Sequence, residues 1–290
     1  MARAGLSRRR GGDTGEPGGS PPIGLTLAEW RAGAPELAEE VAEEWGLRLG
    51  EPYVPGACGH VVRVELPDGT PAVLKVHWPH RESLQEADAL ERWNGDGAVR
   101  LLARDDDRSA LLLERCEPGA FLSSAGNGAA LDVLVGLLPR LWKSPDGFAT
   151  IEDEVPYLLE DLGGARDARL RDAAATCLRD LVPTQGERVL VNEDLHGENV
   201  LAARREPWLA IDPKPVAAER ELGVASIVRS NELGHSKRDV LYRLDRLCSE
   251  LDLDRERALG WTVAHTVAWS GSHDHDDPHL EAVRWLLEEA

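Results

Sequence analysis

Residues 192–199 read NEDLHGEN, and residues 211–215 read IDPKP. Brief apolar runs accompany these two stretches, and they cover residues 189–191, 200–203 and 208–211. Runs of this length between polar loop residues predict short strands, here a small hairpin within a longer helical region. We therefore expect Asp194 and Asn199 to share one loop and Asp212 to end a strand.

Asp194 and Asn199 stand five residues apart, which is the spacing found in loops that transfer phosphoryl groups. In such a loop the aspartate positions an acceptor hydroxyl and takes its proton, and the asparagine oxygen binds Mg²⁺. Asp212 can supply a second oxygen ligand to the same ion. Because Asp and Asn are also common in ordinary turns, these three residues alone leave a purely structural loop as the alternative.

Residues 71–77 predict an apolar strand that contains one lysine, Lys75. An unpaired ammonium inside a core is costly, so Lys75 requires an anionic partner. Glu86 on the following helix is the favoured partner, and Glu82, one turn earlier, competes with it. A strand lysine paired with a helix glutamate holds the α- and β-phosphates in kinases. The alternative is an edge-strand lysine that extends outward to solvent.

Two further segments are candidates for nucleotide binding. Glu114 and Cys116 follow the last predicted strand of the first half, where backbone groups of a crossover segment would bind an adenine edge; this assignment rests on topology alone. Residues 54–60 carry two glycines and are a weak candidate for a loop over the phosphates, since a plain hairpin turn fits equally well. The sequence has no Walker A motif.

The pattern of elements predicts an α+β fold in two parts. Residues 1–22 are rich in Gly, Pro, Arg and Ser and predict a disordered tail. Residues 23–116 predict a small antiparallel sheet with two helices: helices at 26–45 and 81–93, and strands at 48–54, 60–66, 71–77, 98–103 and 110–115. Residues 117–290 predict a larger helical part, with helices near 128–143, 156–182, 219–234, 237–252, 255–270 and 278–289.

Composition narrows the possible partners. The net charge of −19 disfavours a nucleic-acid partner, and it favours either cationic ligands or simple solubility. The four cysteines form no C-x-x-C pair, so a disulfide framework or zinc knuckle is not indicated. The chain has neither an apolar run of membrane-spanning length nor a signal-peptide pattern. We expect a monomeric cytoplasmic protein without a membrane partner.

Four stretches carry a resemblance to a known family: DLHGENVL at 194–201, EPWLAIDPKP at 206–215, EADAL at 86–90 and LLLERC at 111–116. With these, the chain resembles the aminoglycoside phosphotransferase family of the protein-kinase-like fold, and most closely its streptomycin 6-kinase and hydroxyurea phosphotransferase branch. The resemblance covers about residues 47–229. It implies a two-lobed fold with a nucleotide-binding N-lobe and a helical C-lobe that carries the catalytic loop and the acceptor site.

The resemblance also implies ATP or GTP with Mg²⁺, and transfer of the γ-phosphate to a hydroxyl of an antibiotic. Asp194 matches the catalytic base of the family, Asn199 and Asp212 match its metal ligands, and Lys75 matches its phosphate-binding lysine. Asn192 departs from the pattern, because the family usually has a histidine there that braces the loop. No A-P-E triplet, the mark of the activation segment in protein kinases, follows Asp212, which argues against a protein substrate.

The sequence leaves more than one class of molecule as the possible phosphoryl acceptor. A cationic antibiotic is favoured, and its candidate carboxylates are Glu152, Asp153, Glu154, Glu232 and residues 274–277. A metabolic kinase for a choline-, homoserine- or sugar-like acceptor shares every residue named so far, and a non-catalytic pseudokinase is a further alternative. Residues 273–279 have metal-ligand residue types, but a solvated loop is favoured over a hydrolase site there because the spacing matches no zinc motif.

Overall fold

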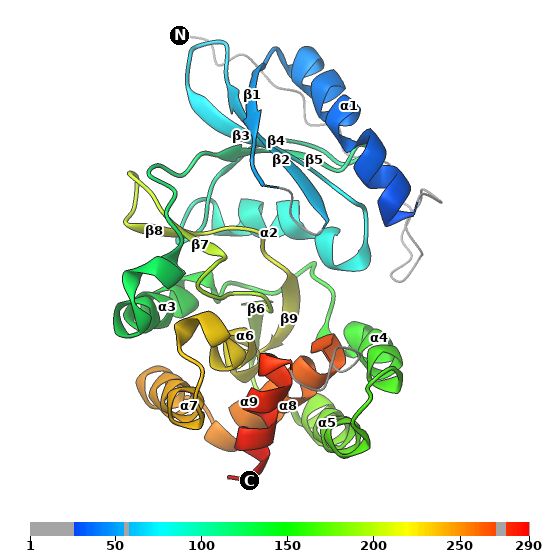
Figure 1. The fold of residues 1–290 in the computed structure, drawn as a ribbon, viewed down its shortest axis with the longest axis vertical. Coiled ribbons are helices and arrows are strands. Elements are labelled where there is room, and N and C mark those ends of the chain that lie inside the picture. The colour runs from blue at the N-terminus through cyan, green and yellow to red at the C-terminus, as the bar shows by residue number, and fades with distance from the viewer. Residues whose placement is uncertain (1–25, 55–57, 271–276, 290) are drawn as a thin grey trace. The chain divides into compact units, whose positions relative to one another are not determined.

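The computed structural model describes residues 26–54, 58–270 and 277–289 (Figure 1). The chain divides into two compact units, residues 1–119 and 120–290. The predicted tail at 1–22 lies outside the described residues, as do most of the 273–279 run and the middle of the 54–60 loop. No helix among the described residues is long and apolar enough to cross a membrane.

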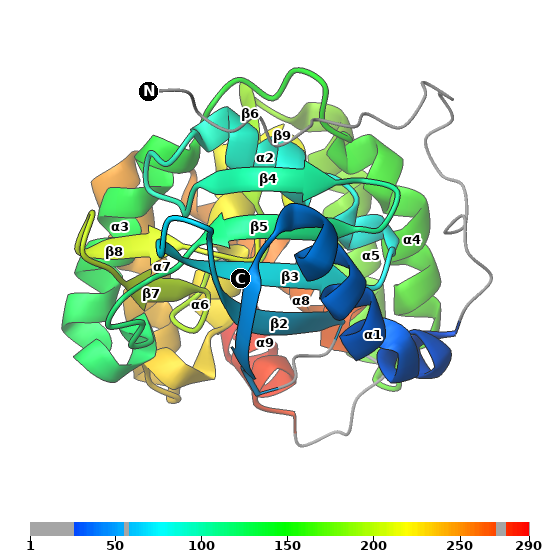
Figure 2. The same cartoon turned by 90° about the horizontal axis from the view of Figure 1, so that it is seen from above.

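The first unit is a five-stranded antiparallel sheet with a helix packed on it. Its strands follow the order β1-β2-β3-β5-β4, and Figure 2 shows α1 lying across them. The elements are α1 Leu27–Trp45, β1 Arg48–Pro52, β2 Gly59–Glu65, β3 Pro71–His77, a 3-10 turn Arg81–Ser83, α2 Glu86–Trp93, β4 Leu101–Asp105 and β5 Ala110–Glu114.

Helix α1 begins and ends at residues suited to those positions. Thr26 and Glu29 form a reciprocal capping box at its start. Gly46 ends it with φ +65°, in the left-handed region that favours glycine. Trp30 and Val41 on its inner face pack into a core with one face of the sheet. The predicted helix at 26–45 is therefore confirmed.

Strand β3 is the middle strand of this sheet, and its successive side chains point alternately to the two faces of the sheet. Leu74 and Val76 are fully buried in the core that includes α1. Lys75 lies between them in sequence, so its side chain points to the opposite face of the sheet. That face is where the structure places the first residue of α2, Glu86.

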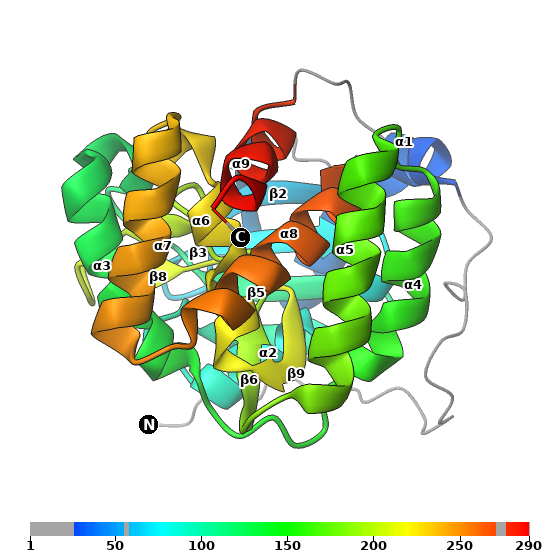
Figure 3. The same ribbon diagram turned by 90° about the horizontal axis from the view of Figure 1, so that it is seen from below.

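The second unit is mainly helical. Its helices and strands are α3 Asn127–Leu141, α4 Ile151–Gly163, α5 Ala168–Leu181, β6 Arg188–Asn192, β7 Val200–Ala202, β8 Trp208–Ala210, β9 Pro215–Glu219, α6 Ala225–Arg229, α7 Lys237–Leu251, α8 Arg255–Ser270 and α9 Pro278–Leu287. Its 3-10 turns are Leu122–Ala125, Val182–Thr184, Arg220–Val224 and Asn231–Leu233. Helix α8 is buried on nearly all sides, and Figure 3 shows it between α5 and α7. A helix that is covered all round forms the centre of a bundle.

The predicted helix at 219–234 is not one continuous helix. Its first residue, Glu219, ends β9, which pairs antiparallel with β6. The rest of the range forms a 3-10 turn at Arg220–Val224, the short helix α6 and a second 3-10 turn at Asn231–Leu233. Strand β9 itself was not predicted, because its five residues are all buried and a short buried run cannot be assigned to helix or strand from periodicity alone.

The predicted helix at 156–182 is also wrong, because it is two helices. Helix α4 ends at Gly163, and Gly164 follows it. Asp167 then starts α5 by accepting hydrogen bonds from the backbone N–H groups of Arg169 and Leu170. The apolar spacing continues across this region, but the two adjacent glycines and the capping aspartate favour an end and a new start over one continuous helix.

Candidate active site

The pairing of β6 with β9 brings together two loops that are far apart in sequence. Asn192, the last residue of β6, lies opposite Pro215, the first residue of β9. The loop that follows β6 and the segment that precedes β9 therefore leave the sheet side by side. The backbone N–H of Glu193 donates to the backbone oxygen of Lys214 at 2.9 Å, which continues the pairing by one step.

Asn192 joins these two loops with its side chain. Its Oδ1 accepts the backbone N–H of Asp194 at 3.1 Å and that of Lys214 at 3.1 Å. The residue is buried, and its amide nitrogen has no hydrogen-bond partner among the described residues. One oxygen therefore braces the loop at the position where the family usually has histidine.

The β7–β8 hairpin places Asn199 beside Asp212. Val200 pairs with Ala210, and one residue further the backbone N–H of Ile211 donates to the oxygen of Asn199 at 2.9 Å. Asp212 follows with φ +49°, a left-handed conformation that is uncommon outside glycine and asparagine and that often marks functional positions. The hairpin register thus brings the two predicted metal ligands to the same strand ends.

The side chain of Asn199 is oriented by Asp194. Its Nδ2 donates to the backbone oxygen of Asp194 at 2.9 Å and to Oδ2 of the same residue at 3.1 Å. Its Oδ1 is therefore on the opposite side of the amide group from the contacts with Asp194. One amide oxygen and one carboxylate are a donor set that suits Mg²⁺, which commonly takes few protein ligands and completes its shell with phosphate oxygens and water.

No cluster of three or more His, Cys, Asp or Glu side chains among the described residues has the arrangement of a metal site. Of the run at 273–279, the described part shows Asp277 accepting the backbone N–H of His279 at the start of α9. The rest of that run lies outside the described residues.

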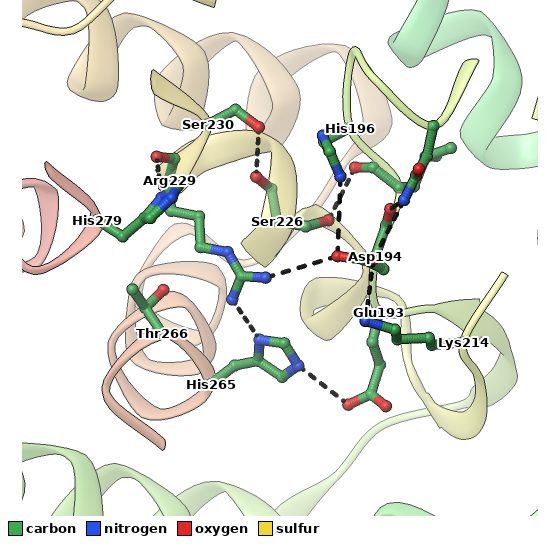
Figure 4. Close-up of polar contacts among 12 residues, drawn as sticks. Glu193, Asp194, His196, Lys214, Ser226, Arg229, Ser230, His265, Thr266 and His279 are labelled. Atoms are coloured by element: carbon green, nitrogen blue, oxygen red, sulfur yellow. Dashed lines mark hydrogen bonds and ion pairs between the residues drawn. The ribbon is translucent and has the colours of Figure 1, made fainter. Parts of the chain in front are cut away.

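Three basic side chains surround the carboxylate of Asp194 (Figure 4). Lys214 Nζ lies 3.1 Å from Oδ2. Arg229 and His196 lie on the other oxygen, with Arg229 Nη2 at 3.8 Å and His196 Nε2 at 3.9 Å from Oδ1. Each of the two carboxylate oxygens therefore has its own cationic neighbour.

Arg229, at the end of α6, is held in place by α8. Its guanidinium Nη1 lies 2.7 Å from Nδ1 of His265, and its Cζ lies 4.5 Å from the centre of the Trp269 ring. His265 and Trp269 are four residues apart on α8 and so share one face of that helix. Burial disfavours the charged form of Arg229 and lowers its pKa despite the nearby Asp194 and Glu193 carboxylates.

His265 links Arg229 back to the loop (Figure 4). A guanidinium only donates hydrogen bonds, so Nδ1 of His265 must accept, and the ring proton lies on Nε2. That Nε2 is 3.4 Å from Oε1 of Glu193, the residue before Asp194. The loop is thereby contacted at two consecutive side chains by residues from α6 and α8. Sequence analysis missed Arg229 and His265, because no local pattern links them to residues 193 and 194.

The other end of the loop is fixed by Glu232. Its Oε1 lies 3.1 Å from Nδ1 of His196 and accepts the backbone N–H of Gly197 at 3.1 Å. Desolvation is the largest single influence and opposes both charges, but the hydrogen bond between the two side chains and the attraction of nearby opposite charges together outweigh it. The pKa of His196 is therefore raised, and that of Glu232 is lowered to about 2.

Gly197 lies in a closely packed part of the loop. An added Cβ would lie 3.3 Å from Cδ2 of Leu233 and 3.3 Å from Cα and Cβ of Ser123. The backbone oxygen of Gly197 also accepts the N–H of Ser123 at 3.0 Å. On the loop's inner side, Ser226 of α6 donates its hydroxyl to the backbone oxygen of Leu195 at 2.8 Å (Figure 4).

Replacing Glu232 by glutamine is expected to lower the free energy of unfolding by about 1–3 kcal/mol near pH 5.5, since the charge is lost while an amide oxygen remains. The lowered pKa of Glu232 gives stability that is complete above its ordinary 4.5 and is lost as pH falls toward 2. The raised pKa of His196 gives stability that is complete below its ordinary 6.5 and is lost as pH rises through the raised value. Urea unfolding should show the largest difference in free energy of unfolding between wild type and Glu232→Gln at pH values between 4.5 and 6.5. An equal difference at about pH 9 would contradict the ion pair.

In the first unit, the structure joins Lys75 to Glu86. Nζ of Lys75 lies 2.7 Å from each carboxylate oxygen of Glu86, and both side chains are buried. Glu82, the competing partner, lies on the 3-10 turn with its side chain 36% exposed and 3.6 Å from Arg81. The expected pairing of the strand lysine with the helix glutamate is confirmed.

Glu114 and Cys116 lie where β5 ends. The backbone N–H of Glu114 donates to the oxygen of Arg100 at 2.9 Å, and its side chain accepts the N–H of Arg100 at 3.1 Å. The Glu114 amide is therefore occupied, which leaves the segment after it as the part that can offer backbone groups to a base. Cys116 is buried there.

Three of the candidate acceptor carboxylates, Glu152, Asp153 and Glu232, make contacts with neighbouring residues of the fold. Asp153 belongs to the capping box that starts α4, and Glu152 accepts from Gln185 and Arg188. Glu232 is engaged by His196, as described above. Of residues 274–277, only Asp277 is described.

Most of the chain is similar in sequence to proteins of known activity. The family model described as aminoglycoside/hydroxyurea antibiotic resistance kinase matches residues 50–277. Streptomycin 6-kinase of Streptomyces griseus is 38% identical over 253 residues, which is 82% of this chain and 82% of that protein. Hydroxyurea phosphotransferase of Kitasatospora aureofaciens is 38% identical over 260 residues, which is 84% of this chain and 74% of that protein.

Solved structures share the fold at low sequence identity. Choline kinase LicA from Streptococcus pneumoniae aligns with a TM-score of 0.61 at 12% identity, over 88% of this chain and 97% of that one. A spectinomycin phosphotransferase aligns with a TM-score of 0.55 at 14% identity, over 88% and 94%. The predicted α+β, protein-kinase-like fold is confirmed.

Proposed function

Since this chain belongs to the aminoglycoside/hydroxyurea antibiotic resistance kinase family, we propose that it transfers the γ-phosphate of ATP to a hydroxyl group of an antibiotic and so inactivates it. Membership confirms the branch that the sequence motifs indicated. The observation that carries the proposal is the identity of 38% with streptomycin 6-kinase over 82% of both chains. The site geometry supports the same chemistry, because a carboxylate, an amide oxygen and a second carboxylate meet at adjoining loop ends.

The proposed reaction is an in-line displacement. The acceptor hydroxyl oxygen forms a bond to the γ-phosphorus as the bond from that phosphorus to the β,γ-bridging oxygen breaks, and ADP leaves. The hydroxyl proton passes to the carboxylate of Asp194. The contacts that orient Asp194, from Asn199 on one oxygen and from Arg229 and His196 near the other, support this role.

Asn199 and Asp212 are the proposed ligands of Mg²⁺, through the amide oxygen that points away from Asp194 and the neighbouring carboxylate. The ion, when bound, offsets the negative charge of the phosphates. Lys75 is the proposed ligand of the α- and β-phosphates, and its bidentate pair with Glu86 supports that role by fixing the ammonium. The segment ending at Cys116 is the proposed binding site for the adenine edge. GTP is the alternative donor.

An antibiotic is proposed as the acceptor because the relatives that match over most of the chain are named for antibiotics and hydroxyurea. No comparable similarity supports the metabolic alternative, since the choline kinase likeness is at 12% identity and concerns the fold. The acidic net charge is consistent with a cationic acceptor.

The purified protein should be incubated with radiolabelled ATP, Mg²⁺ and one acceptor at a time. We expect label to move to streptomycin or to another antibiotic, with hydroxyurea and a tuberactinomycin peptide as the next acceptors tested. Choline and homoserine serve as metabolite controls in the same series. Transfer to choline or homoserine with none to any antibiotic would refute the proposed acceptor class but not the reaction type.

A further inference from the structure

We propose that Lys214 is a further catalytic residue, which binds a non-bridging oxygen of the phosphoryl group while that group moves from nucleotide to acceptor. This inference rests on the proposed kinase function and adds a residue to it. Lys214 lies two residues after Asp212, in the segment that precedes β9. Its side chain contacts the proposed base, and its backbone is part of the same loop pairing.

The backbone of Lys214 is fixed on both sides without help from its charge. Its N–H donates to Oδ1 of Asn192 at 3.1 Å, and its backbone oxygen accepts the N–H of Glu193 at 2.9 Å. Main-chain and amide contacts therefore join this segment to the Asp194 loop in addition to the ammonium contact. We expect the two loops to stay joined when the ammonium is removed.

The ammonium lies on the side of Asp194 that faces the metal ligands. Lys214 Nζ is 3.1 Å from Oδ2, and Oδ2 also accepts Nδ2 of Asn199 at 3.1 Å. Lys214 and Asn199, a proposed Mg²⁺ ligand, therefore contact the same oxygen of the proposed base. The proposal places a phosphoryl oxygen within reach of the Lys214 ammonium.

The side chains of Arg229 and Lys214, which both lie near the Asp194 carboxylate, differ in how exposed they are. The side chain of Arg229 is 5% exposed and packs on Trp269. The side chain of Lys214 is 29% exposed. Arg229 is suited to hold the carboxylate in a constant orientation, and Lys214 can reorient toward a ligand, as long flexible ammonium side chains do.

The chemistry at this position favours an anionic partner for Lys214. An ammonium has three N–H bonds, so one can remain on Asp194 while another reaches a phosphoryl oxygen. Negative charge is spread over the three non-bridging oxygens as the new oxygen–phosphorus bond forms and the bond to ADP breaks. A cation that contacts those oxygens as this charge develops stabilises the transition state more than the ground state.

The test compares Lys214→Met and Lys214→Arg with the wild-type enzyme, on the acceptor found active in the screen. We expect Lys214→Met to lower kcat by about 10²–10³-fold, with the KM values for ATP and acceptor changed far less, because the contact is made in the transition state. Lys214→Arg should recover part of the loss, since it retains the charge with a different geometry.

A second readout separates phosphoryl contact from mere positioning. Replacing ATP by the analogue with sulfur on the γ-phosphorus weakens hydrogen bonds to the non-bridging positions. The ratio of the rate with ATP to the rate with the thio analogue should therefore be smaller in Lys214→Met than in the wild type. A residue that only holds Asp194 in place would leave that ratio unchanged.

Lys237→Met is the matched control, because Lys237 on α7 pairs with Glu288 and Glu289 and its loss changes the net charge equally. It should leave kcat unaltered. A Lys214→Met enzyme with wild-type kcat, or one with lowered kcat and an unaltered thio ratio, would overturn the proposal.

A failure of the proposed antibiotic-kinase function can be distinguished from a failure of the role proposed for Lys214. If the wild type transfers phosphate to no acceptor, the antibiotic-kinase function is refuted, and Lys214→Met is compared with the wild type on ATP hydrolysis, in which water takes the place of the acceptor. Slower hydrolysis in the variant then supports the role of Lys214, and equal hydrolysis refutes it.

Discussion

Asp194→Asn is expected to lower kcat by about 10²–10⁴-fold, which is the range for loss of a general base. The asparagine retains the shape of the side chain but cannot accept the hydroxyl proton. The backbone oxygen of Asp194 still accepts Nδ2 of Asn199, so that part of the loop geometry is retained. A coupled assay of ADP release measures kcat, and calorimetry with ATP and Mg²⁺ measures nucleotide affinity, which should be nearly unchanged.

The matched control is Asp172→Asn on α5, where the carboxylate is 75% exposed. It removes one negative charge from the same unit at a site that has no part in the proposed chemistry, and kcat should be unaltered. A wild-type kcat in Asp194→Asn would show that Asp194 is not the base. Loss of nucleotide binding in that variant would instead show that its main role is structural.

Glu86→Ala is expected to lower the free energy of unfolding by about 3–5 kcal/mol, the cost of leaving one member of a buried ion pair without its partner. Glu86 is 1% exposed and Lys75 is 8% exposed, so water can replace the lost carboxylate only by entering the first unit. Urea unfolding at neutral pH measures the change.

The double variant Lys75→Met with Glu86→Leu separates stability from function. Apolar side chains of similar size in both positions should restore much of the stability, because neither charge then remains buried. ATP binding should stay weak, since the proposed phosphate ligand is gone. A double variant that still bound ATP with wild-type affinity would remove Lys75 from the nucleotide site.

Sequence patterns predicted the parts of the site that depend on local order. The Lys75–Glu86 pair follows from a charged residue in an apolar strand and the first carboxylates of the next helix, eleven residues on. The Asp194 and Asn199 spacing and Asp212 lie within one loop and one hairpin, whose short apolar runs are readable. The capping box at Thr26 was readable for the same reason.

The element boundaries near the site were less readable. The strand at 215–219 was not predicted, because its five buried residues show no alternation. Its pairing with β6 depends on contact between residues more than twenty positions apart, and no turn signal marks it. That register is what places Lys214 beside Asp194 and lets Asn192 bridge both loops.

By itself, the sequence determined the reaction class, the family and the residues of the proposed phosphate chemistry, because these lie in contiguous motifs whose spacing is set by one loop or hairpin. Only the tertiary structure decided which cations surround Asp194. Lys214 lies just before β9, Arg229 ends α6 and His265 lies on α8. The pairing of β6 with β9 and the packing of α6 on α8 bring these three side chains together. These contacts join residues that are far apart in sequence, so they produce no periodic pattern from which they could be predicted.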